Sequence, residues 1–354
     1  MLMLEENFRS VVPYTPGEQP QDKDVIKLNT NENPYPPSPL AAKAISEFDA
    51  DTLRLYPDPA STDLVNAIAE TYNVSPDMVY TGVGSDDVLA LSFLTFFNSG
   101  RPVLFPDITY SFYTVWTDLF RIPYEQLPLK EDLSIEPEAY MNRKNGGIVL
   151  ANPNAPTGLY LADEYVEKIA AANPGSVVII DEAYADFADS NSLGLVSKYE
   201  NVIVVRTFSK SRSMAGLRIG YAIGCPKLIK ALNDVRYSFN SYPMTRVSQA
   251  AGAAVLKDND YFEETVKKIK ATREWTKKAL RELGFTFPDS KTNFIFASPP
   301  EGGKNANELF LELKKRRIYV RHFNGERVED GLRITIGTDR QMKQFIDVLK
   351  ELLS

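Results

Sequence analysis

The sequence predicts an α/β fold: a large domain with a mostly parallel central sheet flanked by helices, and a smaller α+β domain after it. Three short apolar runs, at residues 147–150, 177–180 and 202–205, carry this prediction, because each resembles a strand buried on both faces. Helical or loop stretches separate these runs, which favours strand–helix–strand units. A chain of 354 residues has room for two domains.

The first 45 residues are expected to form an N-terminal arm that joins the smaller domain. Residues 13–39 are rich in proline and asparagine, which is typical of an extended segment without a core of its own. Such an arm must lie on another part of the molecule. We expect the large domain to span residues 46–258, and the small C-terminal domain to span residues 259–354, where a long charged helix from Tyr261 to Leu283 is predicted.

Composition and charge exclude several classes of function. The chain has 40 Lys and Arg against 47 Asp and Glu, a net charge of −7, which argues against binding to nucleic acid or to an anionic membrane. One cysteine, Cys225, and one histidine, His322, leave no set of ligands for zinc and no intrachain disulfide. With no signal peptide and no apolar run of membrane length, we expect a cytoplasmic protein that binds no metal.

The same scarcity of cysteine and histidine disfavours Ser-His-Asp and Cys-His catalysis. Any chemistry must therefore use lysine, aspartate, tyrosine and arginine. We leave His322 out of the site, because it lies in a strand-like stretch and Lys210 can already carry protons.

Polar residues follow the second and third apolar runs, where an open parallel sheet binds its ligands. They include Asp181 after the second run and Lys210 after the third, with Arg218 a short distance further on. An acid, a lysine and an arginine at one sheet edge suit pyridoxal phosphate, an aldehyde that carries a phosphate and a ring nitrogen. Lys210 would hold the aldehyde as a Schiff base, and Asp181 would keep the ring nitrogen protonated. Arg218, with Ser209 and Thr207, would bind the phosphate.

Two further features are compatible with this cofactor. The run from Thr81 to Asp87 precedes an apolar helix, so its N–H groups could receive a phosphate, although Ser85 could equally be an ordinary helix cap. Tyr110 could stack on a flat ring, but an aromatic residue in this stretch is as well explained by the core.

In order along the chain, these motifs resemble those of the fold-type I pyridoxal-phosphate aminotransferases and, within them, the histidinol-phosphate aminotransferases. The resemblance covers essentially the whole chain. It is carried by the segments Pro13 to Gly17, Asn29 to Pro34, Leu55 to Asp58, Gly82 to Asp86, Asn152 to Gly158, Asp181 to Tyr184, Thr207 to Lys210, Gly216 to Gly220 and Leu332 to Gly337.

The resemblance implies a role for each cofactor-binding residue. Lys210 would form the internal aldimine, Asp181 would pair with the ring nitrogen, and Tyr184 would bind the ring oxygen. The cofactor phosphate would be lined by Ser85, Asp86, Thr207, Ser209 and Arg218. In a homodimer, Tyr56 would reach the phosphate of the neighbouring subunit.

One position departs from the family pattern. The family usually has an asparagine directly before Pro-Thr-Gly, in contact with the ring oxygen, and this chain has Ala155 there. Asn154 is the candidate replacement.

The resemblance also implies the substrate site. Arg333 matches the arginine that holds the carboxylate of the amino acid, or the equivalent group of the other substrate. The candidates for holding a substrate phosphate are Arg321, Tyr14 and the segment Asn31 to Tyr35, from which Asn33 and Tyr35 are assigned to the site.

The implied reaction belongs to histidine biosynthesis. It is amino transfer between L-glutamate or 2-oxoglutarate and imidazole acetol phosphate or L-histidinol phosphate. An aromatic amino-acid aminotransferase stays open, because Tyr14, Tyr35, Tyr110 and Phe239 would accept an aromatic side chain. A lyase similar to threonine-phosphate decarboxylase also stays open, because the same cofactor serves different bond cleavages. A regulator that only binds the cofactor is disfavoured, since no helix-turn-helix fits before residue 13.

Overall fold

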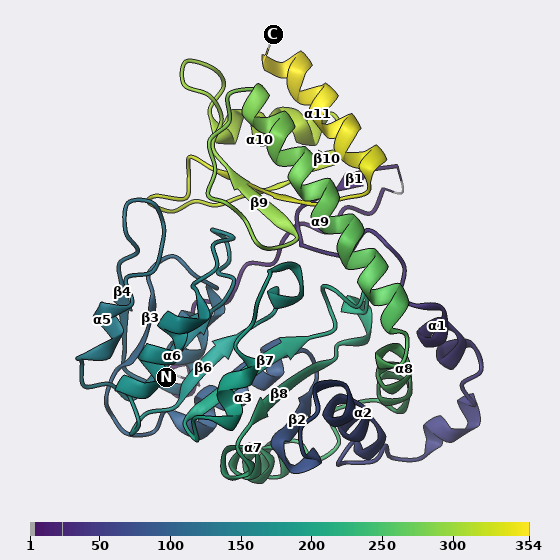
Figure 1. Ribbon diagram of the computed structural model, residues 1–354, viewed down its shortest axis with the longest axis vertical. Helices are drawn as coiled ribbons and strands as arrows, with labels where there is room; N and C mark the ends of the chain where they lie inside the picture. Colours follow the sequence, from purple (N-terminus) through teal and green to yellow (C-terminus); the bar gives the residue numbers. More distant parts are fainter. Residues whose placement is uncertain (1–3, 23, 354) are drawn as a thin grey trace.

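A seven-stranded sheet forms the centre of the larger part of the molecule in the computed structural model, which describes residues 4–22 and 24–353 (Figure 1). Across the sheet the strands run in the order β2-β8-β7-β6-β5-β3-β4, and β8 runs in the direction opposite to the other six. The strands are β2 (Val79–Gly82), β3 (Val103–Pro106), β4 (Tyr124–Leu127), β5 (Gly147–Ala151), β6 (Val178–Asp181), β7 (Val202–Thr207) and β8 (Gly220–Gly224). The predicted mostly parallel sheet is confirmed, and the three apolar runs form β5, β6 and β7.

Alternate residues of the central strands belong to two separate hydrophobic cores. Ile180 and Val204 pack in one core, whereas Ile179 and Val205, their neighbours in sequence, pack in the other. Side chains alternate between the faces of a strand, so a continuous apolar run fills both cores.

Helices cover both faces of this sheet. The first core is closed by α2 (Thr62–Tyr72), α6 (Asp163–Ala172) and α8 (Arg246–Leu256), and the second by α3 (Ser85–Phe96), α4 (Phe112–Phe120) and α7 (Pro226–Phe239). Helix α1 (Pro39–Ser46) packs on α8, and the single turn α5 (Glu138–Met141) packs on α6.

The C-terminal residues form a smaller α+β unit, which lies above the large sheet in Figure 1. An antiparallel sheet has the order β11-β12-β9. The elements of the unit are α9 (Asn259–Glu282), β9 (Phe294–Ala297), α10 (Ala306–Lys315), β10 (Ile318–Tyr319), β11 (Arg321–His322), β12 (Leu332–Thr335) and α11 (Asp339–Leu353). The expected boundary between the two domains stays a prediction.

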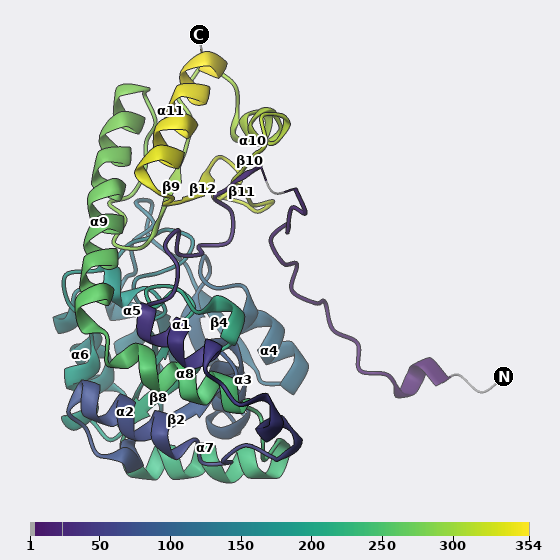
Figure 2. The ribbon, with the colours of Figure 1, turned by 90° about the vertical axis from the view of Figure 1, so that its right-hand side faces the viewer.

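The N-terminal segment joins this smaller unit before the chain enters the large sheet. Strand β1 (Ile26–Lys27) pairs in parallel with β10, and Leu28 is buried in the core of the smaller unit. Before β1, the described chain has one short 3-10 turn (Leu4–Asn7), and Figure 2 shows this arm extending beyond the rest of the ribbon. The side chain of Val12, on the arm, is 80% exposed. Within the described residues, no helix has the length and apolar character needed to cross a membrane.

Candidate active site

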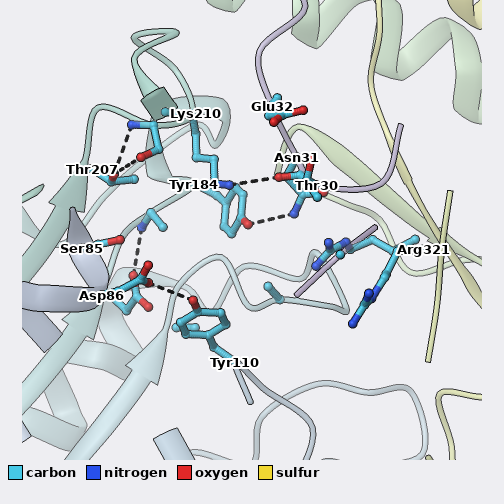
Figure 3. Close-up of a pocket in the computed structure, with 18 of the residues that line it drawn as sticks. Thr30, Asn31, Glu32, Ser85, Asp86, Tyr110, Tyr184, Thr207, Lys210 and Arg321 are labelled. Carbon is cyan, nitrogen blue, oxygen red and sulfur yellow. Dashed lines mark hydrogen bonds between the residues drawn. The ribbon is translucent and has the colours of Figure 1, made fainter. Parts of the chain in front are cut away.

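A cavity of about 400 Å³ lies where the carboxyl ends of the central strands meet the N-terminal segment and the smaller unit. That volume suits a cofactor and a small substrate. Figure 3 shows side chains from all three regions around it. The predicted site residues that line it are Tyr14, Ser85, Asp86, Tyr110, Asp181, Tyr184, Thr207, Ser209, Lys210, Arg218, Arg321 and Arg333.

Asp181 is a buried carboxylate at the last position of β6. The hydroxyl of Tyr113 donates to its Oδ2 at 2.8 Å, and the N–H of Ala183 donates to its Oδ1 at 3.2 Å. Burial raises the pKa of Asp181 to about 6, although these two hydrogen bonds oppose the shift. Among the described residues, no lysine or arginine forms an ion pair with it. A protonated ring nitrogen would supply the missing positive partner.

Lys210 follows β7 and extends toward the N-terminal segment (Figure 3). Its Nζ donates to the carbonyl oxygen of Thr30 at 3.3 Å and lies 5.8 Å from the centre of the Tyr184 ring. The side chain of Asn33 donates to the backbone carbonyls of Lys210 and Ser211, at 3.0 and 3.1 Å. The N-terminal segment therefore fixes the loop that carries the lysine.

The first turn of α3 and the loop after β7 form an anion-binding corner. Helix α3 begins at Ser85, and the N–H groups of a first turn have no acceptor within their own helix. A Cβ on Gly220 would lie 2.3 Å from the backbone nitrogen of Ser85, so glycine is what allows β8 to pass directly against this turn.

Arg218 and two hydroxyl groups complete this corner. Arg218 donates from Nη1 to the Ser209 hydroxyl at 3.5 Å and pairs through Nη2 with Asp86 at 3.0 Å. The hydroxyl of Thr207 donates to that of Ser209 at 2.9 Å. A phosphate would meet a guanidinium, hydroxyl groups and helix N–H groups here, which is the donor set that the cofactor phosphate needs.

The opposite end of the cavity has two arginines on neighbouring strands. Arg321 of β11 and Arg333 of β12 stand directly opposite each other in an antiparallel pair. Like charges in that position repel, so an anion bound between them would stabilise the pair. Arg333 donates from Nη2 to the carbonyl oxygen of Asn29 at 3.0 Å, while its buried Nε has no partner in the described part of the chain.

The surroundings of the two arginines differ. Burial lowers the pKa of Arg333, and no carboxylate of the described residues forms an ion pair with it. Arg321 donates to the carbonyl oxygens of Thr15 and Pro16, at 3.0 and 3.2 Å, and so holds the N-terminal arm against β11. This arm places the ring of Tyr14 at the cavity, stacked on Phe112 with centroids 4.3 Å apart.

Asn154 lies outside the cavity lining, and its neighbour Ala155 faces the cavity instead. The Asn154 side chain accepts from the Thr109 hydroxyl at 2.8 Å, and its NH₂ group donates to the Ile108 carbonyl at 2.9 Å and to the Thr157 hydroxyl at 3.1 Å. Because these contacts already engage both of its polar atoms, Asn154 is unsuited to replace the missing asparagine at the ring oxygen.

Three other expected residues lie outside this lining, each for a local reason. The side chain of Asn33 contacts the backbone of the loop that carries Lys210 instead of lining the cavity. Tyr35 packs against the core of the smaller unit, with Lys268 Nζ 5.5 Å from its ring centre. Tyr56 is 77% exposed and stacks on Tyr242 with centroids 4.7 Å apart, and it does not line the cavity of its own chain.

Reasoning from the sequence missed two contacts of the site. Tyr113, in an aromatic stretch that resembles core, bonds to Asp181. A weak signal existed, because Tyr113 comes three residues after Tyr110, which the sequence already makes a candidate for the cavity. The second is Asn31, which donates to the Tyr184 hydroxyl at 2.8 Å across 153 residues of sequence, a separation for which no local pattern exists.

Comparisons with known proteins agree with this geometry. The family model for aminotransferase class I and II matches residues 23–349. A histidinol-phosphate aminotransferase of Brachyspira hyodysenteriae is 50% identical over 99% of this chain and 98% of its own length. A histidinol-phosphate aminotransferase of Lactococcus lactis subsp. cremoris is 50% identical over 99% of this chain and 97% of its own.

A solved structure extends the comparison to three dimensions. The histidinol-phosphate aminotransferase from Sinorhizobium meliloti, in complex with pyridoxal-5'-phosphate, matches with a TM-score of 0.84 and 27% identity, over 93% of this chain and 90% of that one. The chain therefore belongs to the class I and II aminotransferases and, within them, to the histidinol-phosphate aminotransferase family.

Proposed function

We propose that this enzyme uses pyridoxal phosphate to transfer an amino group between L-histidinol phosphate and 2-oxoglutarate, giving imidazole acetol phosphate and L-glutamate. In histidine biosynthesis the reaction runs in the opposite direction. The observation that carries the proposal is the opposed pair Arg321 and Arg333, which lies in the same cavity as Lys210 and the buried Asp181. A dianionic substrate would relieve the repulsion between the two arginines.

The residues at the cofactor end fit pyridoxal phosphate. Asp181 would hold a proton on the ring nitrogen, and Tyr184 would donate to the ring oxygen. The corner formed by Ser85, Ser209 and Arg218 would bind the phosphate. When bound, the cofactor supplies an electron-withdrawing ring that stabilises negative charge on the reacting carbon. Lys210 would hold the aldehyde and then, as a free amine, move the proton at the substrate α-carbon.

The substrate end fits a phosphate better than a neutral side chain. The chain has a net charge of −7, so a dianion is retained only where local donors outweigh the general repulsion. Arg321 and Arg333 provide such donors, and Tyr14 and Tyr110 provide flat walls for an imidazole ring. In the other half of the reaction, Arg333 would hold a carboxylate of glutamate.

We propose a homodimer as the active unit, because an apolar surface patch and much of the N-terminal arm are exposed in the single chain. Large apolar side chains in the patch are 46 to 77% exposed; they are Leu53, Leu55, Tyr56, Phe239 and Tyr242. Arg246, at the start of α8, donates to the Tyr56 carbonyl at 2.6 Å and so connects this loop to α8. A second copy is the partner that would bury the patch and receive Tyr56 at its cofactor site.

Sedimentation at assay concentration tests the dimer and should give about twice the 39.7 kDa chain mass. A fully active monomer would contradict a shared site. The proposal includes a cytoplasmic location, because one cysteine in 354 residues is typical of a reducing compartment.

Product analysis tests the reaction. The purified enzyme, loaded with pyridoxal phosphate, is incubated with 2-oxoglutarate and either histidinol phosphate, phenylalanine or threonine phosphate. We expect glutamate to form fastest with histidinol phosphate, and no carbon dioxide from threonine phosphate. Equal or faster glutamate formation with phenylalanine would favour the aromatic aminotransferase, and carbon dioxide release would favour the lyase.

A further inference from the structure

Asn31 is a buried residue that connects three parts of the molecule. It is 1% exposed and has a left-handed backbone with φ of 56°, a conformation that asparagine and glycine tolerate best. Its backbone N–H donates to the Thr335 hydroxyl at 3.0 Å, and its carbonyl accepts from the Asn293 side chain at 3.0 Å. Its own side chain reaches Tyr184, next to Lys210 (Figure 3).

The hydroxyl of Thr335 fixes which way the Asn31 amide points. That hydroxyl accepts from the Asn31 backbone N–H and donates its own proton to Asn31 Oδ1 at 3.1 Å. If the amide were reversed, the Thr335 proton would lose its acceptor at a position that is 2% exposed. A buried unpaired donor is costly, so the amide oxygen stays toward Thr335 and the NH₂ group toward Tyr184.

This orientation determines what the Tyr184 hydroxyl can do. Asn31 Nδ2 donates to the Tyr184 oxygen at 2.8 Å, and an amide NH₂ group cannot accept a proton in return. The phenol proton must therefore find a different acceptor. Tyr184 lines the cavity, where an acceptor on a bound molecule can receive it.

We propose that Asn31 is a positioning residue that makes Tyr184 a hydrogen-bond donor toward the ring oxygen of bound pyridoxal phosphate. The inference rests on the proposed cofactor. The hydrogen bond from Tyr184 to the ring oxygen matters particularly in this chain. Ala155 contributes only a methyl group to the cavity, and the side chain of Asn154 is engaged elsewhere.

Two substitutions of Asn31 separate this role from a structural one. Asn31→Asp keeps the size and the backbone preference, but its carboxylate accepts the Tyr184 proton and so reverses the donor direction. Asn31→Gly also tolerates the left-handed backbone, and it leaves Tyr184 free to donate into the cavity. A purely structural role predicts that glycine, which removes the whole side chain, is the more harmful change.

The measurement is the pH midpoint of the visible absorbance of bound pyridoxal phosphate in the loaded enzyme. A donor to the ring oxygen stabilises its negative charge and makes the neighbouring Schiff-base nitrogen less basic, so loss of the donor raises the midpoint. We expect a rise of about one pH unit for Asn31→Asp, similar to that for Tyr184→Phe, and less than half of that for Asn31→Gly.

A double variant controls for the added charge of aspartate. In the Tyr184→Phe background, Asn31→Asp should produce little further shift, because no phenol proton is left to redirect. A full shift in that background would overturn the inference, and so would equal shifts for aspartate and glycine.

Thr335→Val gives an independent test that does not alter Asn31 itself. Valine has no hydroxyl to fix the Asn31 amide, so the amide oxygen can turn toward Tyr184 and accept its proton. The pH midpoint should then rise toward the Asn31→Asp value. An unchanged midpoint would contradict the proposed role of Thr335 in orienting Asn31. A wild-type protein with no visible band after loading would overturn the cofactor proposal, and this inference with it.

Discussion

The two ends of the cavity are built in different ways. The cofactor end comes from the ends of neighbouring strands, with Asp181 closing β6 and Lys210 following β7. The substrate end is assembled from segments about 300 residues apart, because Arg333 bonds to Asn29 and Arg321 bonds to Thr15 and Pro16. One end is thus fixed by the sheet itself, and the other exists only when the arm and the smaller unit come together.

The ends also differ in how their charges are balanced. Arg218 at the cofactor end already pairs with Asp86 at 3.0 Å. At the substrate end, Arg333 faces Arg321, and no carboxylate of the described residues pairs with either arginine. An anion bound at the substrate end therefore replaces a repulsion, so that end should discriminate strongly by charge.

The largest effect is expected at the cofactor end, from Lys210→Ala. Without its amine, the enzyme loses both the attachment point for the aldehyde and the proton carrier, so kcat should fall by about a thousandfold or more. Steady-state kinetics measure the loss. Lys198→Ala, which removes a lysine exposed on the surface, is the matched control and should keep full activity. A Lys210→Ala enzyme within tenfold of wild type would remove Lys210 from the mechanism.

The next largest effect is expected at the substrate end, from Arg333→Ala. Loss of two charge-assisted hydrogen bonds should lower kcat/KM about a hundred- to a thousandfold, for histidinol phosphate and glutamate alike. Arg333→Lys should recover only part of this, since an ammonium cannot reproduce the planar fork of a guanidinium. Arg316→Ala, which removes an exposed ion pair just after α10, should have no effect. A loss restricted to one of the two substrates would show that histidinol phosphate and glutamate do not both bind to Arg333.

The burial of Asp181 predicts an effect on the stability of the cofactor-free protein. Its pKa is raised from 3.8 to about 6, so the folded state binds the proton more tightly than the unfolded state does. Stability should therefore fall as pH rises from about 4 to about 6, by about 3 kcal/mol in all.

Denaturant unfolding of the cofactor-free protein measures this effect. Asp181→Asn should be more stable than wild type at pH 8 and similar to it at pH 4, while binding pyridoxal phosphate more weakly. Asp189→Asn is the control, because Lys270 lowers the pKa of Asp189 and its removal should bring no gain. If Asp181→Asn is less stable than wild type at pH 8, a favourable partner stabilises the ionised carboxylate of Asp181 in the folded protein.

The smallest effect is expected from Arg321→Ala. Arg321 shares its donors between the arm and the cavity, so its loss should raise KM for histidinol phosphate by about tenfold and affect unphosphorylated histidinol less. If the preference for the phosphate is unchanged, Arg321 takes no part in phosphate recognition and the argument from the opposed pair fails, while the membership of the aminotransferase family stands.

The same contrast explains how much the sequence could predict. Asp181, Lys210 and Arg218 follow buried apolar runs, so a parallel sheet brings them to one edge, and the sequence alone predicts that they lie together there. The sequence could not show that Tyr14 lines the cavity whereas Tyr35 does not. The path of the arm depends on contacts with β10 and β11 that no local pattern records. The bond from Tyr113 to Asp181 was hidden for a different reason, since a tyrosine among aromatic residues resembles core.

The preference for a phosphate shows whether the opposed arginines recognise the substrate. We would measure kcat/KM of the wild-type enzyme for histidinol phosphate and for histidinol, with 2-oxoglutarate as the acceptor. Because two charge-assisted contacts would be unmade with histidinol, we predict a preference for histidinol phosphate of at least about a hundredfold. Equal values for the two substrates would contradict the account, because the opposed arginines would then contribute nothing to recognition.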